Sequence, residues 1–394
     1  MEESPPMSPP PVARAEIVVD LAAIRHNVAT LRRLVSPEGA DPVQMMTVVK
    51  ADAYGHGIVE AAAAARRAGA EWLGVATLDE AMALRAAGDT GRVLCWLAVP
   101  GEEYAAPVAA DVDVTACTVA QLDEVAAGVA AAGRPARLQL KVDTGLSRGG
   151  STLASWPEVV ARARAGEEAG TWRVTGVWSH FACSDEPDHP ANDAQERAFL
   201  GALDVAEAAG LRPEVRHLAN SAAALLRPSS RFDLVRCGLA SYGLDPAPGF
   251  TRDVGLVPAM TARATLALTK PLAAGASVSY GHTWTAAQPT TVGLVPAGYG
   301  DGVPRHASSA AETWVAGKRR PVRGRICMDQ FVVDLEGDEA RAGDDVVLFG
   351  TGRDGEPTAQ DWAEACGTIS YEIVTRIGGR MTRRHVHPDG GADR

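Results

Sequence analysis

The hydrophobic pattern differs between the first two thirds of the chain and the last third. From Gln44 onward, short runs rich in β-branched and apolar residues alternate with longer, alanine-rich segments whose apolar residues recur at helical spacing. Eight such runs lie within residues 45–51, 72–77, 93–99, 112–117, 137–144, 173–182, 214–221 and 233–243. Alternating strands and helices predict a parallel sheet, and eight strands close a (β/α)8 barrel.

Beyond about residue 248 the helical segments disappear and a second pattern begins. Runs rich in β-formers, separated by glycine turns, occupy residues 262–272, 276–284, 290–302, 323–335 and 344–350. This pattern predicts a second domain built mainly of antiparallel strands. We therefore expect a flexible, proline-rich tail over 1–13, a barrel over 14–247 and a β-rich domain over 248–394.

The composition limits the partners and the compartment. The 394 residues carry a formal net charge of −11, so no net basic field attracts nucleic acid or an anionic membrane. The six cysteines lie far apart without a C-x-x-C pair, which is typical of reduced thiols and favours no metal site. The N-terminus lacks the apolar segment of a signal peptide, and no apolar run approaches the roughly 20 residues of a membrane span. We expect a cytoplasmic protein that binds neither nucleic acid nor membranes.

Polar residues gather at the predicted strand ends. In a (β/α)8 barrel the chemistry lies at the carboxyl ends of the strands, so residues at these positions are candidates for function. Each of them alone could simply mark where a strand meets water. Five of the eight runs supply such a residue, and the set comprises Lys50, Arg148, His180, Asn220, Ser221 and Arg236.

This combination favours one cofactor. A lysine among arginines is disfavoured as an ammonium ion, so its neutral amine is available to attack an aldehyde. Pyridoxal 5'-phosphate is the aldehyde cofactor that uses a lysine, a phosphate site and a partner for its pyridine nitrogen. Arg236 can face the ring nitrogen and His180 can pack near the ring. The phosphate can be bound by the hydroxyl and backbone N–H groups of Ser221, Gly238 and Leu239.

At this point the chain resembles the bacterial alanine racemases, pyridoxal-phosphate enzymes with a barrel and a C-terminal β domain. The resemblance extends from about residue 15 to 380. It rests on the motifs "VVKADAYGHG", "LKVDTGLSRGG", "GVWSHFACSDEP", "RHLANSAA", "FDLVRCGLASYGL", "VSYGHTW", "PAGYGDG", "GRICMDQFVVDL" and "TISYEIVTRIG". It implies an enzyme that interconverts L- and D-alanine, supplies D-alanine for peptidoglycan precursors and forms a homodimer with shared active sites.

The resemblance also implies a mechanism with two bases. Lys50 would hold the cofactor and act on one face of the substrate Cα, and Tyr280 of the second subunit would act on the other face. A planar carbanion can be inverted only if each face has a proton donor. Tyrosine has an ordinary pKa of about 10, so Tyr280 needs help to act as a base. His180 is the expected hydrogen-bond partner.

Further roles follow from the same resemblance. An arginine at the ring nitrogen stays protonated and discourages protonation of the ring, which limits transamination. His217 would support Arg236 in this role. Arg148 would contact the phenolic oxygen of the cofactor and the substrate. Lys141 matches a lysine that is carbamylated in the family, and a negative carbamate would orient Arg148 where an ammonium ion would repel it.

The remaining implied residues bind phosphate or substrate. Tyr54 and Tyr371 correspond to phosphate-binding tyrosines, and the backbone N–H of Met328 would contact the substrate carboxylate. Cys327, Asp329 and Tyr299 would line the approach to the site. The run over 323–335 could equally be an ordinary buried strand.

Three alternatives have distinct signatures. A basic amino-acid decarboxylase of the same architecture would need a carboxylate at the ring nitrogen, where this chain has Arg236. A pyridoxal-phosphate carrier built from a barrel alone would have no use for Tyr280 or Met328. A serine or broad-specificity racemase differs too little in sequence to be separated, although the small pocket that the motifs imply favours alanine.

Overall fold

The computed structural model describes residues 13–39 and 41–387, and it divides the chain into two compact units. The first unit comprises residues 21–258, and the second combines the N-terminal segment up to residue 20 with residues from 259 onward. The predicted tail lies outside the described residues except for residue 13.

The first unit is a nearly closed (β/α)8 barrel, which confirms the predicted fold class. Its eight parallel strands follow the order β8-β7-β6-β5-β4-β3-β2-β9. They are β2 (Gln44–Val48), β3 (Trp72–Val75), β4 (Arg92–Cys95), β5 (Asp113–Ala116), β6 (Ala136–Lys141), β7 (Trp172–Trp178), β8 (Val215–His217) and β9 (Leu234–Cys237). Between the end strands β8 and β9, the backbone N–H groups of Asp233 and Arg236 donate to Arg216 and Ala219 at 3.1 and 3.0 Å.

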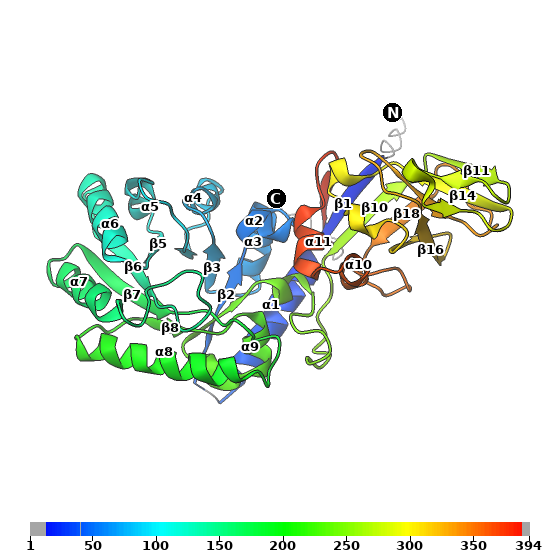
Figure 1. The fold of residues 1–394 in the computed structure, drawn as a ribbon. Helices are drawn as coiled ribbons and strands as arrows, with labels where there is room; N and C mark the ends of the chain where they lie inside the picture. The colour runs from blue at the N-terminus through cyan, green and yellow to red at the C-terminus, as the bar shows by residue number, and fades with distance from the viewer. Residues whose placement is uncertain (1–12, 40, 388–394) are drawn as a thin grey trace, which may run out of the picture. The chain divides into compact units, whose positions relative to one another are not determined.

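Helices surround these strands in Figure 1. The α-helices are α1 (Leu21–Val35), α3 (Ile58–Arg67), α4 (Leu78–Ala86), α5 (Ala105–Ala109), α6 (Val119–Ala132), α7 (Trp156–Glu168), α8 (Pro190–Ala208) and α9 (Ser221–Leu226). The short segment α2 (Lys50–Tyr54) is a left-handed turn and not a right-handed helix. Two 3-10 helices follow, η1 (Pro228–Ser230) and η2 (Leu239–Tyr242). Strands β3, β5 and β9 are buried along their whole length, as expected where side chains on both faces are covered.

Side-chain caps fix where several helices begin. Thr77 and Glu80 form a capping box at α4, in which each side chain accepts a hydrogen bond from the other residue's backbone N–H. The side chains of Thr118 and Asn220 accept hydrogen bonds from the first turns of α6 and α9. Because α9 starts directly after Asn220, the cap also fixes the position of Ser221.

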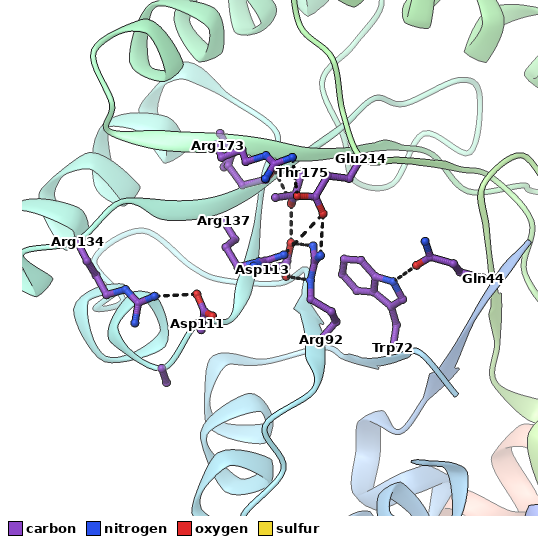
Figure 2. Close-up of polar contacts among 12 residues, drawn as sticks. Gln44, Trp72, Arg92, Asp111, Asp113, Arg134, Arg137, Arg173, Thr175 and Glu214 are labelled. Carbon is purple, nitrogen blue, oxygen red and sulfur yellow. Dashed lines mark hydrogen bonds and ion pairs between the residues drawn. The ribbon is translucent and has the colours of Figure 1, made fainter. Parts of the chain in front are cut away.

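An ion-pair network joins the amino ends of the barrel strands, at the opposite end from the predicted site (Figure 2). The buried Asp113 carboxylate accepts hydrogen bonds from Arg92 Nη2 at 2.8 Å and from Arg137 Nε at 3.1 Å. It also accepts from the Thr175 hydroxyl at 2.5 Å. Glu214, the residue before β8, accepts from Arg92 at 2.7 Å, so residues from β4, β5, β6 and β7 and the segment leading into β8 are connected. The network ties together strands that are distant in sequence.

The second unit contains a nine-stranded, mainly antiparallel sheet, which also agrees with the prediction. Its strand order is β11-β14-β17-β16-β15-β18-β10-β1-β19, and the β1–β19 pair is parallel. The strands are β1 (Ala15–Asp20), β10 (Met260–Thr265), β11 (Leu268–Leu272), β14 (Thr290–Val295), β15 (Glu312–Val315), β16 (Lys318–Arg323), β17 (Phe331–Asp334), β18 (Asp345–Phe349) and β19 (Thr382–Val386). A separate hairpin is formed by β12 (Ser277–Val278) and β13 (Trp284–Thr285).

The unit boundaries differ from the predicted ones at both ends. Strand β1 pairs with β10 and β19, so Ala15–Asp20 belongs to the second unit and not to the barrel. Residues 248–258 belong to the first unit, and the second resumes at Ala259. The pattern of β1 is that of any half-buried strand, and its partners lie more than 240 residues away, so local sequence does not reveal which sheet it joins.

The second unit also contains helices where the sequence pattern predicts strands and turns alone. These are α10 (Ala359–Cys366), α11 (Ser370–Arg376) and the 3-10 helices η3 (Tyr280–His282), η4 (Tyr299–Asp301) and η5 (Arg305–Ala307). A capping box between Thr358 and Asp361 starts α10, and Gly367 ends it in the left-handed conformation. Those two signals were present in the sequence.

Candidate active site

The lysine of the first strand is followed by an unusual backbone. Strand β2 ends at Val48, and the four residues Ala51–Tyr54 after Lys50 have φ between 51° and 56°. L-residues avoid this left-handed region at a cost of roughly 1–2 kcal/mol each. Side chains support the turn, since Glu80 accepts from the Ala51 N–H at 2.6 Å and Asp52 accepts from the Ile58 N–H at 2.8 Å. The sequence "ADAY" gives no local signal of such a turn.

Lys50 lies at the start of this turn in a partly buried position. Its Nζ atom is 5.9 Å from the ring centroids of both Tyr54 and Trp96. Burial lowers the pKa of Lys50, and the positive charges of Arg148 and Arg236 lower it further, whereas Glu80 opposes the shift. The environment therefore favours the neutral, nucleophilic amine that the sequence predicts.

Arg236, in β9, is buried and held by acceptors. Its guanidinium donates to His217 Nδ1 at 2.9 Å and to the carbonyl oxygens of Ser179 at 2.7 Å and Leu218 at 3.0 Å. It also lies 3.1 Å from His180 Nδ1. Burial lowers the pKa of Arg236 to about 9, so the group is still a cation at neutral pH. A fixed cation at this position agrees with the racemase prediction and not with the decarboxylase alternative.

The two histidines of the site are neutral. Burial and then the charges of Arg236, Arg148, Lys141 and Lys50 lower the pKa of His180 well below its usual range. Burial and Arg236 do the same for His217. Each histidine therefore offers a lone pair to Arg236 and adds no further positive charge.

Lys141 and Arg148 lie at and beyond the end of β6. Burial lowers the pKa of Lys141 to about 8, with smaller contributions from the neighbouring Arg236 and Arg148. The Lys141 Nζ atom is 4.6 Å from the centroid of the Trp178 ring. Arg148 lies in the exposed loop that follows, so its side chain is free to face a ligand.

Trp178 is a site residue that the sequence prediction missed. Its indole ring lies 4.9 Å from the Arg236 guanidinium and stacks on His217 with ring centroids 5.5 Å apart. Together with the Lys141 contact, the Trp178 ring contacts two cations and an imidazole. A tryptophan at the end of a barrel strand was the available signal, but it is equally typical of a buried core.

The predicted phosphate residues converge around one glycine. Gly238 donates its backbone N–H to Ser221 Oγ at 2.9 Å. A Cβ atom on Gly238 would lie 2.3 Å from the Tyr54 hydroxyl, so only glycine fits this close approach. Leu239 follows at the start of η2, and the Asn220 amide oxygen accepts from the Ser184 hydroxyl at 2.9 Å. The hydroxyl groups of Tyr54 and Ser221 lie close to the backbone of Gly238, a polar cradle that fits a phosphate, and the Lys50 amine fits the carbonyl carbon of pyridoxal phosphate.

The predicted residues of the second unit form a separate cluster. Tyr280 follows Ser279, whose hydroxyl donates to the Arg325 carbonyl at 2.5 Å and lies 3.4 Å from Cys327 Sγ. The Tyr299 N–H donates to the Cys327 carbonyl at 3.0 Å. Because these bonds connect the loops before β17 and after β14, Tyr280, Tyr299 and Cys327 are brought together within this unit. Residues 325–330 form no strand, so the strand alternative for this part of the run fails.

Met328 and Asp329 lie in the same loop. Met328 accepts at its carbonyl from the Gly300 N–H at 2.8 Å. Asp329 forms an ion pair with Arg380 at 2.6 Å, and Arg380 also donates to the buried Asp301 at 2.9 Å. Asp329 is thus held by an ion pair within its unit, a role that the sequence prediction did not include. Tyr371, predicted to bind phosphate, lies in α11 of the second unit.

Residues 13–39 and 41–387 contain no group of three or more His, Cys, Asp and Glu side chains that could hold a metal ion. In the same ranges, no helix combines the length and the apolar character needed to cross a bilayer.

Comparisons with known proteins agree with the architecture. The model of the alanine racemase N-terminal domain matches residues 19–246, and that of the C-terminal domain matches residues 259–385. The alanine racemase of Salinispora arenicola is 54% identical over 371 residues, covering 94% of this chain and 98% of the relative. That of Streptomyces coelicolor is 54% identical over 383 residues, covering 95% and 97%.

Solved structures extend this agreement to three dimensions. Alanine racemase from the D-cycloserine producer Streptomyces lavendulae superposes with a TM-score of 0.93 at 52% identity, covering 98% of this chain and 99% of that one. The enzyme from Bacillus anthracis, solved with bound L-Ala-P, gives a TM-score of 0.85 at 32% identity and 96% coverage of both chains. With both domains matched in order and nearly full coverage, the chain belongs to the alanine racemase family of pyridoxal-phosphate-dependent isomerases.

Proposed function

We propose that the protein interconverts L- and D-alanine with pyridoxal 5'-phosphate bound in the first unit, and thereby supplies D-alanine for peptidoglycan precursors. The observation that carries the proposal is the partly buried Lys50, whose pKa is lowered by burial and by Arg148 and Arg236, in a chain of this family in which Arg236 donates to His217. Relatives that are 54% identical are alanine racemases, which favours alanine over serine as the substrate. D-alanine would be produced by the reaction in the direction from L-alanine.

The residues of the first unit would hold the cofactor. When bound, pyridoxal phosphate supplies a carbonyl that captures amines and a ring that withdraws electrons from the substrate Cα. The lowered pKa of Lys50 increases the fraction of neutral amine, the form that can bond to a carbonyl carbon. The phosphate would be bound by Tyr54, Ser221, Gly238 and Leu239, and Asn220 caps α9, the helix that begins at Ser221. Tyr371 would be a further phosphate ligand.

Arg236 would set the electronic character of the site. A guanidinium at the pyridine nitrogen donates hydrogen bonds and keeps its own protons, so it does not protonate the ring. With the ring left unprotonated, the bound cofactor would withdraw electrons more weakly, and Arg236 would thereby limit transamination. His180 and Arg148 would contact the ring side and the phenolic oxygen, and Arg148 together with the Met328 backbone N–H would bind the substrate carboxylate, with Cys327, Asp329 and Tyr299 along its approach.

Proton transfer would use two bases, Lys50 of one copy of the protein and Tyr280 of the other. The Lys50 amine would exchange a proton with one face of the substrate Cα, and the Tyr280 phenol with the opposite face. Three large apolar side chains of the second unit are exposed, namely Tyr280 at 73%, Tyr299 at 41% and Met328 at 55%. A group of exposed apolar side chains is typical of an interaction surface. Their exposure supports a homodimer in which they complete the site of a second copy, with His180 as the hydrogen-bond partner of Tyr280.

The test is racemisation of each alanine enantiomer in deuterated water, with deuterium incorporation followed at Cα. Wild type should incorporate deuterium in both directions, and Lys50→Ala should lose measurable turnover. Removing the phenol hydroxyl in Tyr280→Phe should lower racemisation by about 10²–10⁴-fold, the usual contribution of a general acid or base. The amount of deuterium kept per turnover should then differ between the two directions, because one face has lost its proton donor.

Matched variants separate chemistry from folding. Lys270→Ala removes an exposed lysine of β11, and Tyr104→Phe removes a buried hydroxyl that has no partner among the described residues. Both should retain wild-type rates. Normal rates in both directions for Tyr280→Phe would refute the two-base assignment, and absent turnover in wild type would refute the proposed function itself.

A further inference from the structure

Gln139 is a fully buried amide in the middle of the site's scaffold. The pairing of β6 with β7 shifts by one residue between Leu138 and Gln139, which leaves Thr175 as the extra residue and places Gln139 opposite Gly176. A Cβ atom on Gly176 would lie 2.6 Å from Gln139 Cδ. The bulge and the glycine together make room for the amide side chain inside the barrel.

The amide oxygen of Gln139 contacts His217, and the chemistry determines how. Arg236 Nη1 lies 2.9 Å from His217 Nδ1, and a guanidinium can only donate, so Nδ1 must accept. A neutral imidazole carries one proton, which must then be on Nε2. Gln139 Oε1 lies 2.8 Å from His217 Nε2 and accepts that proton's hydrogen bond. With the amide reversed, two donors would face each other.

The choice of an amide matters as much as its position. A carboxylate in the same place would stabilise the imidazolium form, whose Nδ1–H would point at the Arg236 guanidinium and repel it. Burial and Arg236 already lower the pKa of His217 well below its usual range. An uncharged acceptor preserves that neutral state. Gln139 Nε2 has no hydrogen-bond partner among the described residues, so the site retains a buried donor without a partner in order to present the oxygen.

We propose that Gln139 is a positioning residue for the racemisation, which holds His217 as the neutral Nε2–H tautomer and thereby directs Arg236. The proposal rests on the proposed function, in which Arg236 faces the pyridine nitrogen. Gln139 acts through His217 and contacts neither substrate nor cofactor. It adds a third member to the chain of contacts Gln139–His217–Arg236, which runs across β6, β8 and β9.

The test uses full-length protein labelled with [15N]histidine, as the loaded enzyme and after cofactor removal. The ring nitrogen shifts of His217, assigned by their loss in His217→Asn, report the tautomer and the charge directly. Wild type should show a single neutral Nε2–H form from pH 6 to 9. Gln139→Leu should populate both tautomers. Gln139→Glu, which keeps the shape of the side chain and therefore the packing, should raise the His217 pKa by more than about one unit.

Turnover provides the second measurement. Gln139→Glu should lower kcat about tenfold or more while changing KM for alanine less than about twofold, and should raise transamination relative to racemisation. The control is Gln44, whose amide oxygen accepts from Trp72 Nε1 at 2.6 Å at the other end of the barrel. Gln44→Glu should leave the His217 shifts unchanged.

Failure of the proposed role of Gln139 can be distinguished from failure of the proposed racemase function. Wild-type ring shifts in Gln139→Glu, or altered shifts with an unchanged kcat and an unchanged share of transamination, would overturn the role of Gln139. Lack of racemisation by wild type would refute the proposed function while leaving the tautomer measurement interpretable, because that measurement needs no turnover.

Discussion

The network at the amino ends of the barrel strands predicts a large loss of stability in Asp113→Asn. The carboxylate accepts two hydrogen bonds from Arg92, at 2.8 and 3.1 Å, one from Arg137 at 3.1 Å and one from Thr175 at 2.5 Å. Asparagine keeps one oxygen and replaces the other with an NH2 group. That NH2 group would face the Nε–H donors of Arg92 and Arg137, which the lost oxygen had satisfied.

The magnitude follows from these contacts. Hydrogen bonds to charged groups contribute about 1.5–3 kcal/mol each, so losing two sets an upper range of about 3–6 kcal/mol. The Asp113 side chain is 0% exposed, but those of Arg92 and Arg137 are 28% and 25% exposed and can recover some hydration. We therefore expect the unfolding free energy of the barrel to fall by about 3 kcal/mol.

The assay is thermal and urea unfolding of cofactor-free protein, because bound cofactor would add its own stabilisation. A loss of about 3 kcal/mol corresponds to about 6–12 °C in the transition of the first unit. Asp111→Asn is the matched control, since its ion pair with Arg134 at 3.0 Å has both side chains about half exposed (Figure 2). That variant should lose less than about 1 kcal/mol. Equal losses in the two variants would refute the argument that burial makes the Asp113 network important.

Two further predictions concern the site. Gly238→Ala should weaken cofactor affinity about tenfold or more, because the new Cβ would lie 2.3 Å from the Tyr54 hydroxyl. The control is Gly201→Ala, whose new Cβ would have nothing within 4 Å and should leave the affinity unchanged. Equal cofactor affinities of the two variants in a titration would contradict the proposed phosphate cradle. The pKa of Lys141 is lowered to about 8, so its amine loses its proton as the pH rises through about 8. Over the same pH range, the neutral amine should bind more 13C-labelled carbon dioxide as a carbamate. The carbon NMR signal should vanish in Lys141→Arg and remain in Lys270→Arg, and a signal that survives Lys141→Arg would show that another amine reacts.

Features that depend on local pattern were predictable from the sequence. Each of the eight barrel strands coincides with a predicted run to within one residue at its start, and polar residues at their carboxyl ends converge as the barrel geometry requires. Lys50 and Arg236 could be singled out because a charged residue at the end of an apolar run is chemically conspicuous. The quoted motifs then assigned the family.

Features that depend on distant partners were not predictable. The sheet that β1 joins is decided by β10 and β19, and the conformation of Ala51–Tyr54 is held by Glu80 from another helix. Gln139 in "LQLK" resembles a solvent-facing strand residue until the bulge opposite Gly176 turns it toward His217. In each case the deciding contact comes from a residue that is remote in sequence.

The surroundings of Arg236 have a consequence for how new chemistry could arise on this barrel. Its guanidinium connects β9 to the ends of β7 and β8, because it donates to Ser179 just after β7, to His217 in β8 and to Leu218 just after β8. A carboxylate at position 236 would confront these same acceptors with no proton to share. Conversion toward a reaction that needs a carboxylate at the ring nitrogen would therefore require several coordinated substitutions, and single mutants would first lose the closure of the barrel. Directed evolution from this scaffold should begin with the acceptors and not with the arginine.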